Sequence, residues 1–153
     1  MINFNPQILK LFRDSKDDLV DTTDYLHFDD RGPELALIYS KLFWPDLIEV
    51  DGFVFISEKY ERRNYELIIT DARVNNVESY VNTFYLFDAV GTGEYDCEDE
   101  IWELLGHTLC ETWKQRAQCL FPQKSFVTEF AWYSDDIGDP GVTLYQPKFV
   151  SKE

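Results

Sequence analysis

Apolar residues at helical spacing mark the two clearest helices of the chain. The pattern predicts a long helix from about residue 96 to 121, with Pro122 just beyond its end. A second helix opens at Gly32-Pro33 and ends before Pro45, because a residue that precedes proline is pushed out of the helical region. The apolar positions of the long helix that fall in one sector of a wheel are Ile101, Leu104, Leu105, Thr108, Leu109, Thr112, Trp113, Ala117 and Leu120.

An earlier helix is predicted near the start of the chain. Asn5 is a good N-cap and Pro6 occupies the first helical position, where the missing N–H costs nothing. The polar stretch over residues 21–30 follows as a predicted loop.

Alternating and β-branched runs predict the strands. Leu47–Val50 and Phe53–Ile56 are separated by Asp51-Gly52, which indicates a β-hairpin, although a single bulged strand is the alternative. Residues 125–133 alternate as a strand, and a turn-rich connection over residues 135–141 leads to a last, antiparallel strand over 142–146. We expect the tail over residues 147–153 to be loosely held.

The segment over residues 57–90 carries mixed preferences. Two short helices are predicted, within residues 58–69 and 74–87, while Phe84-Tyr85-Leu86-Phe87 fits a strand equally well. Taken together, the elements predict one α+β domain over residues 1–153, with helices packed on one face of a small antiparallel sheet.

Composition is consistent with one stable core. The chain has 153 residues, of which 44% are hydrophobic and 16% aromatic. No stretch approaches the roughly 18 apolar residues that span a bilayer, and the first residues do not resemble a signal peptide. Three cysteines form no paired framework, which favours reduced thiols in a cytoplasmic protein. We therefore expect no membrane association.

Charge is the most informative property. The formal net charge is −15, and the middle third of the chain carries most of it. This charge repels nucleic acid, whose phosphates have the same sign, and attracts a basic protein surface. Solubility alone is the plainer explanation of the acidity.

The acids concentrate at the predicted start of the long helix. Six of the ten residues from 94 to 103 are acidic. Acidic residues suit the positive end of the helix dipole, which is one explanation. The other is a docking face for a basic partner, with Tyr95 and Trp102 as aromatic anchors, since the wheel places Trp102 outside the core sector. The candidate partner-binding residues are Glu94, Tyr95, Asp96, Glu98, Asp99, Glu100, Trp102 and Glu103.

Only two histidines limit catalysis and metal binding. His107 has Glu103 and Glu111 one helical turn to either side, a possible set of three metal ligands, but a solvated polar face is the simpler interpretation. His27 precedes two aspartates in an acidic loop, where loop polarity explains it. We expect no metal site and no catalytic residue at either position.

Other motifs are explained by local structure. Asp135, Asp136 and Asp139 miss the spacing of a calcium loop, and Gly91-Thr92-Gly93 lacks the lysine of a phosphate-binding loop. Cys97 stands at a helix start, where a thiol pKa can fall, but neighbouring carboxylates oppose that shift. No cofactor is predicted.

Part of the chain resembles a group of small uncharacterised bacterial proteins. The similarity covers Leu37-Ile38-Tyr39-Ser40-Lys41-Leu42-Phe43-Trp44-Pro45 with Glu49-Val50-Asp51-Gly52, and extends to Phe126-Val127 and Val142–Gln146. The resemblance implies a shared fold and brings no activity or site residue with it.

Three functional hypotheses follow. The first is a non-catalytic acidic protein-binding domain, with an immunity-type neutraliser of a basic partner as its specific form. The second is a small enzyme with a site assembled around His27 or His107. The third is a subunit of a larger assembly that docks through exposed aromatic side chains, its oligomeric state being open.

Overall fold

The computed structural model describes residues 32–90, 99–133 and 138–147. Backbone contacts divide the chain into two units, residues 1–39 and 40–153. In the first unit the described residues are helical and belong to α3 (Gly32–Phe43). The helix predicted from Pro6, the loop over 21–30, and residues 91–98, 134–137 and 148–153 lie outside the described part, and the single domain over 1–153 stays a prediction.

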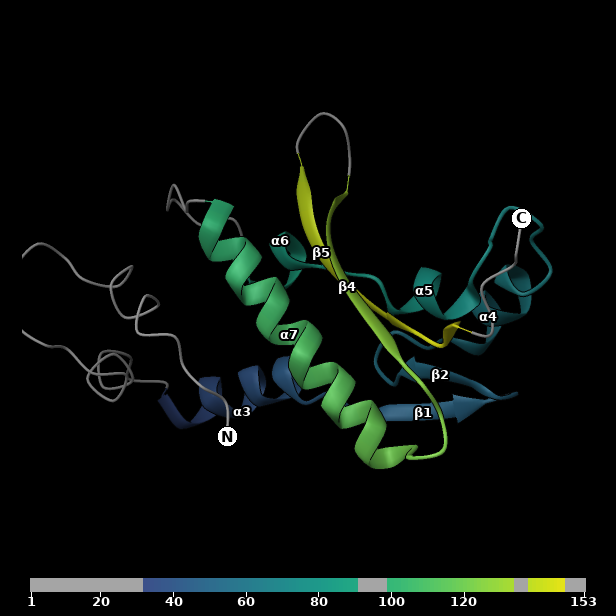
Figure 1. Cartoon of the computed structure of the whole chain (residues 1–153), viewed down its shortest axis with the longest axis horizontal. Coiled ribbons are helices and arrows are strands. Elements are labelled where there is room, and N and C mark those ends of the chain that lie inside the picture. Colours follow the sequence, from purple (N-terminus) through teal and green to yellow (C-terminus); the bar gives the residue numbers. More distant parts are fainter. Residues whose placement is uncertain (1–31, 91–98, 134–137, 148–153) are drawn as a thin grey trace, which may run out of the picture. The chain divides into compact units, whose positions relative to one another are not determined.

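The second unit combines short helices, one long helix and two antiparallel sheets, which confirms the α+β class (Figure 1). The strand orders are β1-β2 in one sheet and β3-β5-β4 in the other, so two small sheets replace the one that was predicted. The helices are α4 (Arg62–Ile68), α5 (Val77–Asn82), α6 (Leu86–Val90) and α7 (Asp99–Leu120); the strands are β1 (Leu47–Val50), β2 (Phe53–Ile56), β3 (Phe84–Tyr85), β4 (Val127–Tyr133) and β5 (Asp139–Tyr145).

The predicted hairpin is confirmed. Leu47 pairs with Ile56 and Val50 with Phe53, and both residues of the turn have positive φ, 52° at Asp51 and 86° at Gly52. Such turns match the twist of the two strands they join. The turn is also held from outside, because the Gly52 carbonyl accepts hydrogen bonds from the Lys124 ammonium and the Gln146 amide, each at 2.9 Å.

The two short helices predicted within residues 58–69 and 74–87 are confirmed as α4 and α5. Of the four residues that also fitted a strand, Phe84-Tyr85 forms β3 and the next two begin α6. One boundary differs from the prediction. The last strand begins at Asp139, not at residue 142, so Pro140 and Gly141 are in a strand and not in the predicted turn. Gly141 fits there because the Tyr133 ring lies where a side chain would be: a Cβ on Gly141 would meet that ring at 2.8 Å.

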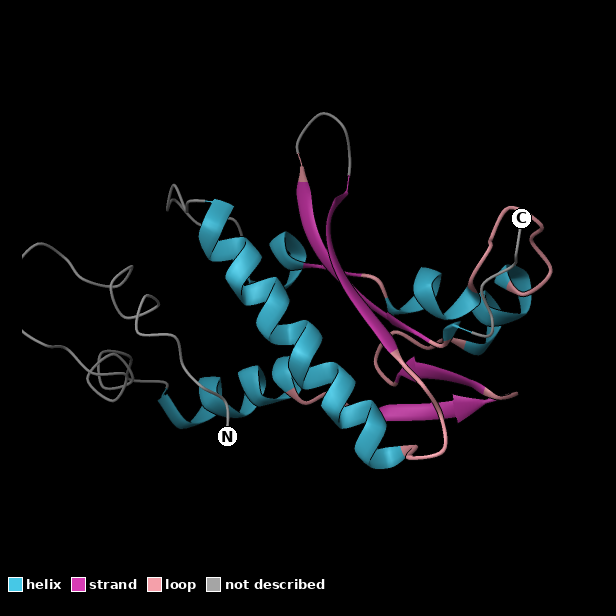
Figure 2. Cartoon of the chain, in the orientation of Figure 1, coloured by secondary structure: helices cyan, strands magenta, loops and turns pink. Residues whose placement is uncertain are grey.

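The hydrophobic core lies between α7 and the two sheets. Figure 2 shows α7 running alongside the β4–β5 hairpin, and it contacts both strands. Trp113 is 1% exposed, and its indole N–H donates to the Leu42 carbonyl at 2.7 Å. None of the described helices combines the length and the apolar character that crossing a bilayer requires. The core residues are Val54, Ile56, Leu86, Trp102, Leu109, Cys110, Trp113, Ala117, Phe126, Val142 and Leu144.

Helix α5 joins the two sheets through buried polar side chains. Glu78 and Asn82, one turn apart, are both fully buried. Asn82 accepts a hydrogen bond from the Ile56 N–H at 2.9 Å and donates to the carbonyls of Val54 and Leu144, also at 2.9 Å. The two side chains therefore take the place of a strand between the edge of β2 and the edge of β5.

The Glu78 carboxylate completes this junction. It accepts the Val54 N–H at 2.5 Å, the Gln146 N–H at 2.6 Å and the Gln146 side-chain amide at 2.6 Å. A buried carboxylate is tolerated only when hydrogen bonds replace its water. Here three N–H donors do so, one from Val54 in β2 and two from Gln146, the residue that follows β5.

We predict that Asn82→Ala lowers the free energy of unfolding by about 3 kcal/mol, because it leaves three buried backbone groups without partners, each costing about 1–3 kcal/mol before relaxation. The exposed Asn64, whose amide bonds only the exposed Glu61 carboxylate, is the matched control. Asn64→Ala should change stability by less than about 0.5 kcal/mol. Urea denaturation followed by tryptophan fluorescence measures both, and equal effects would contradict the proposed role of Asn82.

Candidate partner-binding surface

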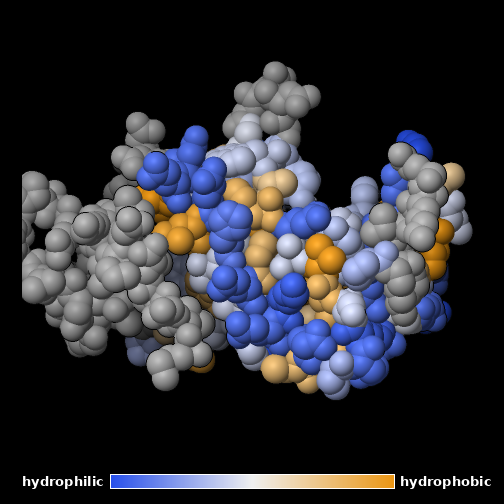
Figure 3. All heavy atoms as spheres, viewed as in Figure 1, coloured by the Kyte–Doolittle hydropathy of each residue, from blue (hydrophilic) through white to orange (hydrophobic). Residues whose placement is uncertain are grey.

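One face of α7 carries a row of exposed acids. The helix begins at Asp99, and a spacing of three or four residues brings side chains to the same face. Figure 3 shows a band of hydrophilic residues along α7. The exposed residues of this acidic face are Asp99, Glu100, Glu103, His107, Glu111 and Lys114. Four carboxylates thus stand against one lysine near the far end of the row.

No cation in the described part of the chain forms an ion pair with these carboxylates. The ion pairs found there join Lys41 and Arg116 to Asp46, Arg62 to Glu66, Arg73 to Asp71, and Lys124 to Glu49. Like charges one helical turn apart destabilise a helix by about 0.2–0.5 kcal/mol per pair. The dipole favours acids only in the first turn, so it does not account for Glu111, three turns further along.

The residues predicted to bind a partner are only partly placed. Asp99, Glu100 and Glu103 are exposed on the acidic face. Glu94, Tyr95, Asp96 and Glu98 lie outside the described residues, as do His27 and Cys97.

The placement of Trp102 outside the core is wrong. Trp102 is 8% exposed and belongs to the core, where its ring meets Phe87 edge-to-face at 5.0 Å. The buried side of α7 also includes Gly106 and Cys110, which the predicted apolar sector leaves out, and Trp102 lies on that side. Two residues of the predicted apolar sector are not in the core: Leu104 is half-buried, and Leu120 is 41% exposed.

A different aromatic pair borders the acidic face. Phe130 and Trp132 on β4 are in edge-to-face contact at 5.9 Å, and the His107 ring lies 5.4 Å from Phe130. Trp132 is 37% exposed. The alternation of residues 125–133 does place both on one strand face, but which face meets α7 depends on long-range packing. Trp132, not Trp102, is the exposed tryptophan beside the acids.

Gly106 permits this arrangement. A Cβ at Gly106 would lie 2.0 Å from a carbon of the Phe130 ring, so only glycine lets α7 approach β4 this closely. The contact holds the acidic face of α7 beside β4.

A groove of about 570 Å³ lies on the face of the β3-β5-β4 sheet that bears Tyr85 and Tyr133. Those two rings meet edge-to-face at 5.7 Å. Burial raises the pKa of Tyr133, with smaller contributions from Glu129 and Tyr85. The lining residues are Arg73, Val74, Asn75, Asn76, Ser79, Tyr80, Thr83, Tyr85 and Tyr133, with no carboxylate and no histidine.

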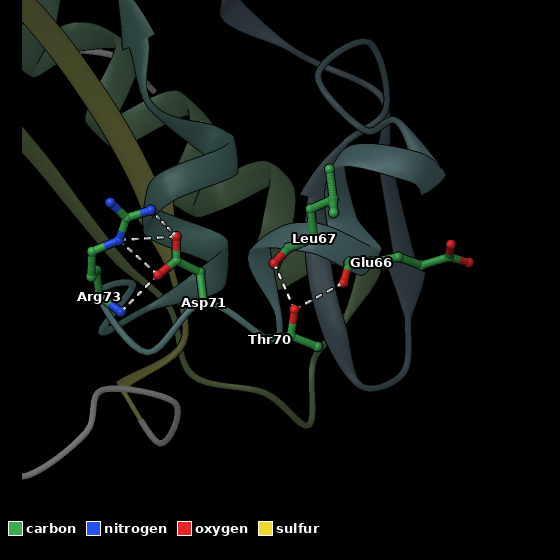
Figure 4. Close-up of polar contacts among 5 residues, drawn as sticks. All are labelled: Glu66, Leu67, Thr70, Asp71 and Arg73. Atoms are coloured by element: carbon green, nitrogen blue, oxygen red, sulfur yellow. Dashed lines mark hydrogen bonds and ion pairs between the residues drawn. The ribbon is translucent and has the colours of Figure 1, made fainter.

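Arg73 at the rim of the groove is already engaged. Its Nε and Nη2 donate to the Asp71 carboxylate at 2.9 and 2.6 Å, which holds the pKa of Asp71 below its usual value (Figure 4). Nearby, the Thr70 hydroxyl donates to the Leu67 carbonyl at 2.9 Å and closes the end of α4. The groove therefore offers tyrosines and amides but little uncompensated positive charge.

His107 belongs to no metal-binding group among the described residues. His107 lines neither this groove nor the smaller cavity beside Lys124 and Gln146, and no group of three His, Cys, Asp or Glu in the described part is arranged to hold a metal ion. Of the predicted aspartate cluster, only Asp139 is described; burial raises its pKa, and Asp88 adds to the shift.

No family model, curated protein or solved structure matches this chain. The resemblance through residues 37–45 and 49–52 stays a prediction.

We predict that Gly106→Ala destabilises the protein by about 1–3 kcal/mol, despite the better helix propensity of alanine, because its Cβ meets the Phe130 ring. In a Phe130→Ala background the same change should be neutral or stabilising. A double-mutant cycle on the free energy of unfolding measures this coupling. Additive effects would show that the two residues do not meet.

We also predict that the two described thiols differ sharply in reactivity. Burial raises the pKa of Cys110 to about 11, whereas Cys119 is exposed. In a Cys97→Ser variant, a thiol-specific disulfide reagent at pH 8 should label one cysteine rapidly and the second only after unfolding, because the thiolate is the reacting form. Cys119→Ser in that background should abolish the rapid phase; two rapid equivalents would contradict the burial of Cys110.

Proposed function

We propose that this chain is a non-catalytic protein-binding domain whose acidic α7 face docks a basic partner protein. The observation that carries the proposal is the set of four exposed carboxylates, Asp99, Glu100, Glu103 and Glu111, that no cation of the described part neutralises. A field of one sign speeds the encounter with a surface of the opposite sign and repels nucleic acid. An immunity-type neutraliser of a basic protein, acting in the cytoplasm, is the specific role we favour.

The neighbouring aromatics support a docking role. Interfaces are held at their centre by large aromatic side chains surrounded by polar residues. Trp132 is exposed next to Phe130, whose ring contacts His107 on the acidic face of α7. The charge would bring the partner in, and the tryptophan would contribute buried area.

The exposure of two side chains favours the third hypothesis, a subunit that docks through aromatic side chains. Tyr80, on the rim of the tyrosine groove, is 62% exposed, and Leu67 on α4 is 64% exposed. Tyrosine, asparagine, serine and arginine together are typical of protein-binding surfaces. Binding there would change little with salt, whereas binding by the acidic face would weaken as salt rises.

The enzyme hypothesis has less support. It requires a histidine and converging polar groups in a cavity. His107 lies on an exposed helix face beside Phe130 and lines neither described cavity, and His27 is outside the described residues.

We predict that an octalysine peptide binds the α7 face and that its affinity falls about tenfold between 50 and 150 mM salt, since screening shortens the reach of the carboxylates. NMR titration should shift backbone amides between Asp99 and Glu111. Replacing Glu100, Glu103 and Glu111 by glutamine should weaken binding about tenfold.

The matched control removes three carboxylates elsewhere. Glu58, Glu61 and Glu66 are exposed in and before α4, and changing them to glutamine alters the net charge by the same amount. That variant should bind the peptide nearly as well as the unmodified chain. An equal loss in both variants would show that only net charge matters, and the α7 face would not be a site.

A further inference from the structure

The sheet edges of this protein are treated unequally. An edge strand exposes unpaired N–H and C=O groups that can pair with another chain, and proteins ordinarily cover or shorten such edges. The outer edge of β2 is occupied by Glu78 and Asn82, which bond the N–H groups of Val54 and Ile56. The part of β5 beyond β3 is occupied by the same two side chains, through Leu144 and Gln146.

The outer edge of β4 has no such cover in the described part of the chain. β4 runs for seven residues, Val127–Tyr133, and stands last in the order β3-β5-β4. Its principal neighbours among the described elements are β5, along one side, and α7, across one face. The other edge strands are shorter: β1 has four residues and β3 has two.

The sequence of β4 contains none of the usual protections of an edge. It reads Val-Thr-Glu-Phe-Ala-Trp-Tyr, with no proline, no glycine and no lysine, and it pairs with β5 one residue to one, without a bulge. Valine, threonine and aromatic residues favour an extended chain. It is the longest described edge, and its backbone is ready to accept another strand.

Carboxylates stand on both faces of this edge. On the side of α7, the Phe130 ring of β4 lies against Gly106, and Glu111 is exposed further along the same helix. On the opposite face Glu129 is exposed and accepts a hydrogen bond from the Tyr145 hydroxyl at 2.8 Å. Glu111 therefore stands on the helix that packs against β4, and Glu129 stands on the strand itself.

We propose that the outer edge of β4 is a docking site for an extended, basic segment of the partner protein, which adds to the sheet as a fourth strand. Backbone hydrogen bonds along the edge give affinity, and side chains that alternate between the two faces give specificity. A lysine or arginine directed to one face meets Glu111, and one directed to the other face meets Glu129. The basic character of the segment rests on the proposed function; the pairing rests on the edge itself.

A second copy of this chain fits the edge less well. Pairing two β4 strands would bring together two chains that each carry a net charge of −15, with a Glu129 on each strand. Like charges close together across paired strands are destabilising. Charge therefore selects a cationic segment over self-association.

The test compares two peptides that differ only in their backbone. One is an eight-residue peptide in which pairs of lysines alternate with pairs of valines, so that an extended chain presents lysines on both faces; the other has the same side chains and is N-methylated at every residue, so that it keeps its charge but donates no N–H. The first should bind at least about tenfold more tightly than the second. It should also slow hydrogen exchange about tenfold at alternate amides of Val127–Tyr133. The exchange rates of the β5 amides should not change, because β5 is already paired with β4.

The outcomes separate the two proposals. Equal binding of both peptides, with shifts confined to Asp99–Glu111, would overturn the strand addition and leave the acidic docking face standing. Binding of neither peptide would overturn both. Slow exchange at every β4 amide in the free chain, or a dimer by analytical ultracentrifugation, would show that the edge is already occupied and would also overturn the strand addition.

Discussion

The hydrogen bonds of Glu78 and Asn82 are the interaction on which the rest of this structure depends. A two-stranded hairpin is only marginally stable alone, and β1-β2 is such a hairpin. By bonding the backbone of β2 on one side and of β5 on the other, α5 ties it to the three-stranded sheet. Only then can residues from both sheets, such as Val54 and Leu144, pack into one core beneath α7. The tie is polar and fully buried, so each missing partner would leave a costly unpaired group.

Elements with local signals were predictable. The hairpin turn was predictable because Asp51-Gly52 favours positive φ at two successive positions. Helix α7 was predictable because its apolar residues recur at helical spacing and Pro122 marks its end. The α5 junction was not. Glu78 and Asn82 look like surface residues of a short helix, and their partners lie 24 to 68 residues away, a separation that no periodicity records.

The same distinction between local signals and long-range contacts applies to the candidate site. Exposure of Asp99, Glu100 and Glu103 followed from the charge of the segment, whereas the position of Trp102 required knowledge of α6, against which its ring packs through Phe87. Trp132 was visible in the sequence as one member of an alternating strand. Its value as an exposed aromatic beside the acids appears only when Gly106 lets Phe130 sit against α7.

The carboxylates of α7 and the outer edge of β4 would contribute to binding in different ways. Carboxylates on a helix face act over about 10 Å at ordinary salt and raise the rate of encounter, but they read no sequence. A strand edge acts only at contact, yet it fixes the register of what it binds, because a slip of one residue turns every side chain to the wrong face. Glu111 stands on α7, which packs on the face of β4 that bears Phe130, and Glu129 lies on the other face, so the register that satisfies both requires cations on both faces of the incoming strand. An acidic surface alone would bind any basic protein, and an open edge alone would invite association with any extended chain. Their combination at β4 narrows the acceptable partner to an extended segment with the right charge on both faces.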